Sequence, residues 1–180
     1  MGYTVELWAA QPGEVLQALA AADPVPPQVP MPDETRAGWA ELAPIVAGAL
    51  RQGGARLVAE YANYVAGVIR AVGHYYGSLD HTSSGGDEFR RRFLSGPAAA
   101  RYGRDSVAHL ITRDLGGLVW EEYPRLGHLT ADEVMAAADR VEAGPPDSAD
   151  HLEDLGPLLE LDRALTRAAR YRLELHAIYG

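Results

Sequence analysis

The chain has 180 residues, of which 47% are hydrophobic and 23% charged, and its formal net charge is −9. This length is enough for one globular domain with its own hydrophobic core. The absence of cysteine excludes disulfides, thiolate catalysis and cysteine-ligated metal centres. All 16 basic residues are arginine, which excludes a Schiff-base lysine and a P-loop lysine and is typical of a GC-rich bacterial genome.

The first residues alternate apolar and polar positions, which predicts a β-strand over residues 3–9. This start lacks the charged and apolar regions of a signal peptide, and no apolar run approaches the length of a bilayer span, so we expect a cytoplasmic protein. A short helix is expected over residues 14–22. The prolines that follow predict an extended loop at 23–33. Too few residues precede this loop to form a core of their own. We therefore expect it to be a loop within a single domain, 1–180, and not a linker between two domains.

Two long helices are expected next. Asp33 is a favourable N-cap for a helix that runs to about residue 52, with Pro44 as an interruption. Apolar residues then recur at helical spacing over 57–76, which predicts an amphipathic helix at the centre of the core. We expect a loop at 73–86, a short arginine-rich helix at 87–94, a helix at 106–112, a turn at Gly116 and Gly117, and a short strand at 118–120.

The C-terminal third carries the clearest helix start. Thr130 and Glu133 have the spacing of a capping box, which predicts a helix that ends near residue 141. A last helix is expected at 155–171, with Pro157 in its first turn. Residues 173–179 alternate again. A lone strand leaves its backbone groups unpaired, so we expect 3–9 and 173–179 to share one sheet. Continuation of the last helix through residue 175 is the alternative.

The predicted fold class is therefore α+β, a mostly helical single domain with a small sheet that contains both terminal strands and with helices packed on one face. The strand and short helix after Met1, Gly2 and Tyr3, the helix start at 129–134, and the helix at 161–171 that leads into a terminal strand resemble the YfbM-like family of small bacterial proteins. The resemblance implies an α+β fold with a small sheet and several helices. The family has no established activity, so the resemblance implies no catalytic residue.

A polar stretch at 80–92 is the strongest candidate for chemistry. Backbone N–H groups of a glycine-rich loop that opens a helix can hold a phosphate or a carboxylate, and arginines on that helix add positive charge. The candidate anion-binding residues are Ser83, Ser84, Gly85, Gly86, Arg90 and Arg91. The alternative is that Ser83 or Ser84 only caps the helix.

An acid–base pair for a small enzyme would come from His81, Asp80, His74 and Tyr76. Adjacency alone does not make a dyad of Asp80 and His81, because catalytic groups normally meet from separate chain positions. The sequence contains no nucleophile elbow, dinucleotide fingerprint or zincin motif. The six histidines lack the spacing of paired metal ligands, so neither a metal nor another cofactor is expected.

Ten acidic residues and one arginine lie between positions 130 and 162. The net charge of this segment is therefore −9, which equals the net charge of the whole chain. This segment is either a surface that faces a partner or a solvated face. The acidic balance argues against nucleic acid as a partner. The leading hypothesis is a non-catalytic interaction or regulatory module, of the immunity type, that binds a protein partner and no membrane. The alternative is a small-molecule or phosphate-binding protein, or a small enzyme, that uses residues 73–92.

Overall fold

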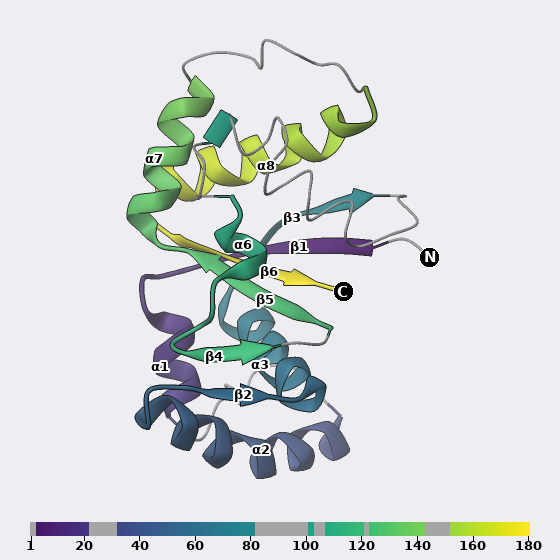
Figure 1. The fold of residues 1–180 in the computed structure, drawn as a ribbon, viewed down its shortest axis with the longest axis vertical. Coiled ribbons are helices and arrows are strands. Elements are labelled where there is room, and N and C mark those ends of the chain that lie inside the picture. The colour runs from purple at the N-terminus through teal and green to yellow at the C-terminus, as the bar shows by residue number, and fades with distance from the viewer. Residues whose placement is uncertain (1–2, 22–31, 82–100, 103–106, 121–122, 143–151) are drawn as a thin grey trace.

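The computed structural model describes residues 3–21, 32–81, 101–102, 107–120, 123–142 and 152–180 (Figure 1). Its main sheet is antiparallel, in the order β3-β1-β6-β5. The strands are β1 (Tyr3–Ala10), β3 (His74–His81), β5 (Arg125–Leu129) and β6 (Glu174–Tyr179). A second sheet pairs β2 (Ala55–Leu57) and β4 (Leu118–Trp120) in parallel. The two terminal strands are neighbours at the centre of the main sheet, which confirms the predicted fold class.

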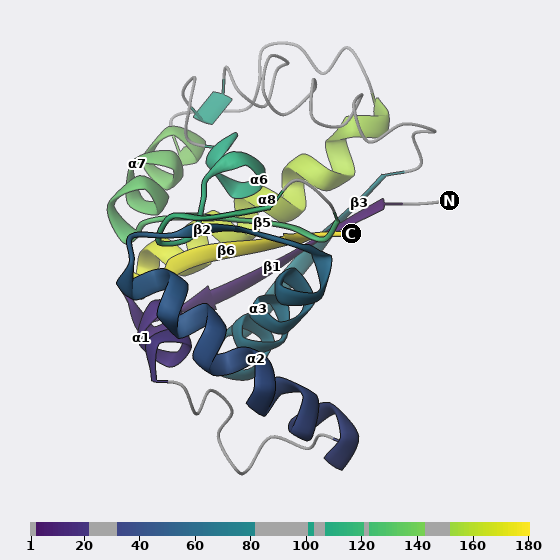
Figure 2. The ribbon, with the colours of Figure 1, turned by 60° about the horizontal axis from the view of Figure 1, so that its bottom comes forward.

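Helices cover both faces of the main sheet (Figures 1 and 2). On one face lie α6 (His109–Thr112), α7 (Ala131–Glu142) and α8 (Leu152–Arg170). On the other lie α1 (Glu14–Ala20), α2 (Asp33–Arg51) and α3 (Ala59–Val72), together with the small sheet. In the described part of the chain, no helix is both long and apolar enough to cross a membrane.

The sheet separates two hydrophobic cores, because successive side chains of a strand point to opposite faces. The core on the side of α6, α7 and α8, here named the upper core, contains Leu7, Leu175 and Tyr179. The core on the opposite side, with α1, α2 and α3, is named the lower core and contains Leu126 and Ile178. The expectation of helices on one face only is therefore wrong. It failed because the alternate positions of the strands were interpreted as facing solvent, whereas His176 is only 1% exposed.

Strand β3 replaces the first part of the loop expected at 73–86. It pairs with β1 along its whole length, and Gly77 has a φ of 133° where the register shifts between Leu7 and Trp8. Only glycine adopts such a φ without strain, so its presence marks the irregularity in the ladder. The helix expected at 57–76 is correspondingly too long at both ends, since residue 57 belongs to β2 and Tyr76 to β3.

The other predicted elements are confirmed with shifted ends. Helix α2 begins one residue earlier than expected, because Pro32 is its N-cap and Asp33 its first residue. Helix α8 begins three residues earlier than expected, so Pro157 lies inside it and not in its first turn. The turn expected at Gly116 and Gly117 is confirmed, and both glycines have positive φ. Most of the loop expected at 23–33 and the helix expected at 87–94 lie outside the described residues.

Candidate functional site

The free edge of β5 is where the chain builds its most distinctive polar site. Helix α6 lies directly against this edge strand, and a Cβ at Gly127 would come within 2.5 Å of the carbonyl oxygens of His109 and Leu110. The chain then passes from the upper core, which holds Ile111, to the lower core, which holds Leu115. The residues that make this crossing are thereby held against the edge of the sheet.

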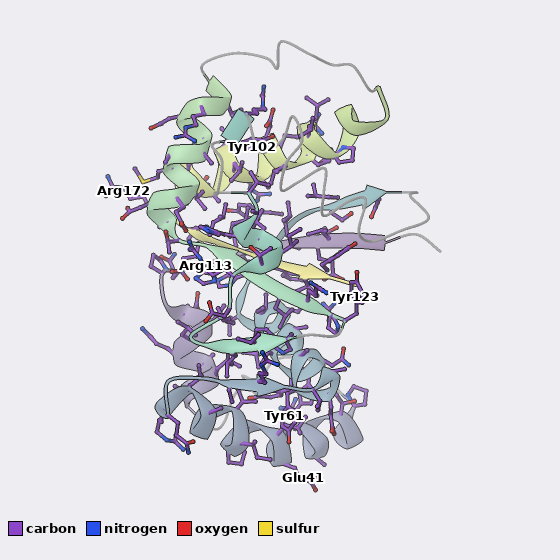
Figure 3. The ribbon with its side chains drawn as sticks, in the orientation of Figure 1. Glu41, Tyr61, Tyr102, Arg113, Tyr123 and Arg172 are labelled. Carbon is purple, nitrogen blue, oxygen red and sulfur yellow. The ribbon has the colours of Figure 1, made fainter. Side chains whose placement is uncertain are left out.

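A cavity of about 270 Å³ lies between the crossing segment, β4 and β5. We name it the edge pocket. Its lining residues are Ile111, Thr112, Arg113, Asp114, Val119, Trp120, Arg125 and Leu126. Figure 3 shows Arg113 beside α6 and β5, at the level of the main sheet. The pocket thus combines an apolar wall with two guanidinium groups and one carboxylate.

Two hydrogen-bond donors of the pocket residues are buried without a partner. Trp120 is 8% exposed, and among the described residues neither its indole Nε1 nor the Nε of Arg125 has an acceptor. The guanidinium carbon of Arg125 lies 5.6 Å from the centre of the Tyr123 ring, and Arg125 forms no ion pair with the described residues. A buried donor without an acceptor costs about 1–3 kcal/mol. Both groups can only donate, so the complement that the pocket lacks is an acceptor.

Arg113 is held in place by Glu133 at the start of α7. Nη1 and Nη2 of Arg113 each donate to a carboxylate oxygen of Glu133, at 2.5 Å. The same carboxylate accepts the backbone N–H of Thr130 at 2.9 Å and its hydroxyl at 3.0 Å, which confirms the predicted capping box. Burial alone would raise the pKa of Glu133, but these hydrogen bonds lower it to about 2. Glu133 is therefore charged at neutral pH and compensates the charge of Arg113.

His109 is the third member of this group. Its Nδ1 lies 2.5 Å from Nη2 of Arg113 and 3.2 Å from Oε1 of Glu133. A guanidinium only donates, so a neutral His109 accepts through Nδ1 and carries its proton on Nε2. A protonated ring would instead donate from Nδ1 to Glu133. His109 thus steadies Arg113 from the side of α6.

Two stacked histidines lie on the lower face of the main sheet. His128 of β5 and His176 of β6 are register partners, with ring centres 5.6 Å apart and planes 17° from parallel. Nε2 of His176 lies 3.5 Å from Glu174, and burial, with His176 as a smaller cause, lowers the pKa of His128 to about 4. Register extends this row through Trp8 to Tyr75, whose rings meet edge to face at 5.2 Å. The row lies on the lower face of the sheet and runs from the buried His176 to Tyr75, which is 53% exposed.

The sequence-predicted acid–base candidates lie elsewhere, all on β3. His74 and Asp80 are about 20 Å apart at ~3.3 Å per residue of strand, so the four candidates do not form one constellation. Tyr76 packs against the upper core with the guanidinium of Arg167 4.3 Å from its ring centre. Asp80 accepts a hydrogen bond from Thr4 at 2.9 Å. None of them lines the edge pocket.

The predicted anion-binding residues at 83–86, 90 and 91 lie outside the described residues. Within the described ranges, no group of three or more histidine, aspartate or glutamate side chains could hold a metal ion. The residues of the edge pocket were missed in the sequence because β4 and β5 come together only through the fold. The available signal was local: Leu118 and Trp120 alternate with Val119, which places the indole on the buried side of a short strand.

Comparison with known proteins found no matching family model, no matching curated protein and no matching solved structure.

Proposed function

We propose that this protein binds a small molecule in the edge pocket through acceptor oxygens of the ligand, a carboxylate group being the best complement. One observation carries the proposal: Trp120 Nε1 and Arg125 Nε are buried donors without partners, on residues that line the same pocket. Nearly all buried polar groups in proteins are satisfied, so a pair of unsatisfied donors in one pocket favours a ligand that satisfies them.

Binding is favoured over catalysis by the state of the other polar groups at the pocket. The hydroxyl of Thr112 donates to the carbonyl of Ala108 at 2.7 Å, and no hydrogen bond joins it to a carboxylate or histidine of the described residues. Arg113 is committed to Glu133. A hydrolytic site would need an activated nucleophile within reach of a base, and the described lining residues supply none.

The hypotheses drawn from the sequence concern other regions. Binding of a protein partner through residues 130–162 stays a prediction, as does an anion site in 73–92 and the resemblance to the YfbM-like family. The edge pocket is independent of all three, because its lining residues lie between 111 and 126.

Substitutions that remove only the unpaired donors test the proposal. Trp120→Phe keeps most of the ring, and Arg125→Met keeps the apolar stem. We expect each variant to bind 4-methylpentanoate, used as a monocarboxylate probe, at least tenfold more weakly than the unmodified chain, about 1.4 kcal/mol. In the free variants, removal of an unsatisfied donor favours folding, whereas the smaller ring at position 120 and the lost Arg125 contact with Tyr123 oppose it, so melting is followed to show that each variant is folded. Titration calorimetry and thermal melting measure the two effects.

Arg51→Gln is the matched control. Arg51 is exposed at the end of α2 and does not line the pocket, yet the variant loses the same charge as Arg125→Met. Its affinity for the probe should equal that of the unmodified chain. Unchanged affinity in both pocket variants contradicts the proposal.

A further inference from the structure

We infer that the ligand of the edge pocket is a zwitterion with an apolar side chain, of the class of the branched-chain α-amino acids. This inference rests on the proposed function and names its ligand class. It follows from which charges of the pocket are compensated by the protein itself and which are not.

The protein neutralises one of the three charged groups that line the pocket. Arg113 is paired through both terminal nitrogens with Glu133, which also caps α7. Arg125 forms no ion pair with the described residues, and neither does Asp114, which lines the pocket and is exposed. The pocket is therefore left with one uncompensated positive charge, on Arg125, and one uncompensated negative charge, on Asp114.

A ligand that complements both charges carries a carboxylate and an ammonium group. The carboxylate has two oxygens, and two lining residues, Trp120 and Arg125, each carry a buried donor that lacks a partner among the described residues. A monocarboxylate would satisfy these donors but would bring its charge close to Asp114 with no compensation. Like charges at a binding site act against the wrong ligand, so Asp114 selects for the ammonium group.

The rest of the lining sets the side chain of the ligand. Ile111 and Leu126 are each 3% exposed and contribute aliphatic surface, Val119 adds a third aliphatic group, and the Trp120 ring completes the wall. Burial of apolar area is worth about 25 cal/mol per Å², so a ligand with an aliphatic side chain gains affinity that glycine cannot. The volume of about 270 Å³ suits a single amino acid.

Calorimetric titration of the full chain with four probes tests the inference. L-leucine carries all three features, 4-methylpentanoate lacks the ammonium group, 3-methylbutylamine lacks the carboxylate, and glycine lacks the side chain. We expect leucine to bind most tightly and each of the other three at least tenfold more weakly. In Asp114→Asn, the affinity for leucine should fall to that for 4-methylpentanoate, while the affinity for 4-methylpentanoate is unchanged or higher.

Asp139→Asn, an exposed acid of α7 away from the pocket, is the control and should bind leucine like the unmodified chain. Equal affinities for leucine and 4-methylpentanoate, with no effect of Asp114→Asn, overturn the zwitterion but leave carboxylate binding intact. Equal affinities for leucine and 3-methylbutylamine overturn carboxylate recognition and with it the proposed function. Binding of none of the probes to the unmodified chain overturns both.

Discussion

At the scale of single residues, buried polar groups without partners distinguish this protein. The described residues include six such side-chain atoms, five of which belong to β4, to β5 or to the histidine stacked on β5. They are Tyr64 Oη, Trp120 Nε1, Arg125 Nε, His128 Nδ1, and Nδ1 and Nε2 of His176. Nε2 of His176 still lies 3.5 Å from Glu174, which is an electrostatic contact at the limit of a hydrogen bond. Each unsatisfied group lowers stability. Their concentration around one edge strand is what a binding site maintained at the expense of stability would produce.

The first residue-scale prediction concerns His128 and acid. Its pKa is about 4 in the folded protein, against about 6.5 for an unperturbed histidine, because burial and the neighbouring His176 disfavour the charged ring. The folded state therefore binds the proton less readily than the unfolded chain. The resulting stability is fully present above pH 6.5 and is lost as the pH falls toward 4.

We expect the free energy of unfolding of the unmodified chain to decrease between pH 7 and pH 4 by ~2–3 kcal/mol more than that of His128→Phe. The phenyl ring keeps the stack on His176 but cannot take up a proton. Urea denaturation at a series of pH values measures the difference. Contributions from other groups, such as Glu133 at lower pH, occur in both proteins and cancel. Parallel stability curves for the two proteins would show that His128 does not resist protonation.

At the scale of elements, the helices and strands that depend on neighbouring residues could be predicted from the sequence, whereas those that depend on distant residues could not. The capping box at Thr130 was readable because both partners lie within four residues. The same is true of the alternation in β1 and β6. Strand β3 was missed because Gly77 and Ser78 resemble loop composition, and its strand character comes from pairing with β1, some 70 residues away in the sequence. The early start of α8 was missed because Pro157 was placed in a first turn.

The cap at Thr130 gives the element-scale prediction. Thr130→Ala removes the hydroxyl, which donates to Glu133 at 3.0 Å and receives the backbone N–H of Glu133 at 3.4 Å. Loss of such a cap costs about 1 kcal/mol, which corresponds to roughly 2–4 °C in melting temperature for a domain of this size. Thr130→Ser keeps the hydroxyl and should melt within a degree or so of the unmodified chain. Thermal unfolding followed by circular dichroism distinguishes them, and equal melting temperatures for the two variants would mean that the cap does not stabilise α7.

At the scale of the whole molecule, the sheet joins two cores that the sequence does not separate. Leu175, Ala177 and Tyr179 of β6 belong to the upper core, while Ile178 of the same strand belongs to the lower core. The alternation was visible in the sequence, and it predicted the strand and its sheet. It did not reveal that both faces are covered, because His176 suggested a solvated face. The edge pocket was equally hidden, since it needs α6, β4 and β5 to converge on one edge.

Because β6 lies at the centre of the main sheet, we expect its deletion to destabilise the whole fold. β6 pairs with β1 from Val5 to Ala10 and with the whole of β5, and Gly180 exchanges two backbone hydrogen bonds with Thr4. Among the described strands, β6 alone connects β5 to the rest of the main sheet, so deletion of residues 173–180 removes this connection and takes buried side chains from both cores at once. Loss of one large core side chain alone costs about 2–5 kcal/mol, and a whole domain is stable by only about 5–15 kcal/mol.

We therefore expect the truncated chain to be recovered only as insoluble protein, or without the cooperative thermal transition of the unmodified chain. Removal of Gly180 alone is the control. It takes away the two hydrogen bonds with Thr4 but no core side chain, so this variant should stay soluble and fold. Soluble expression and circular dichroism measure both outcomes. A soluble 1–172 chain with an unchanged spectrum and a cooperative melt would show that β6 is peripheral, and the two-core architecture would then be wrong, because no other described strand bridges β1 and β5.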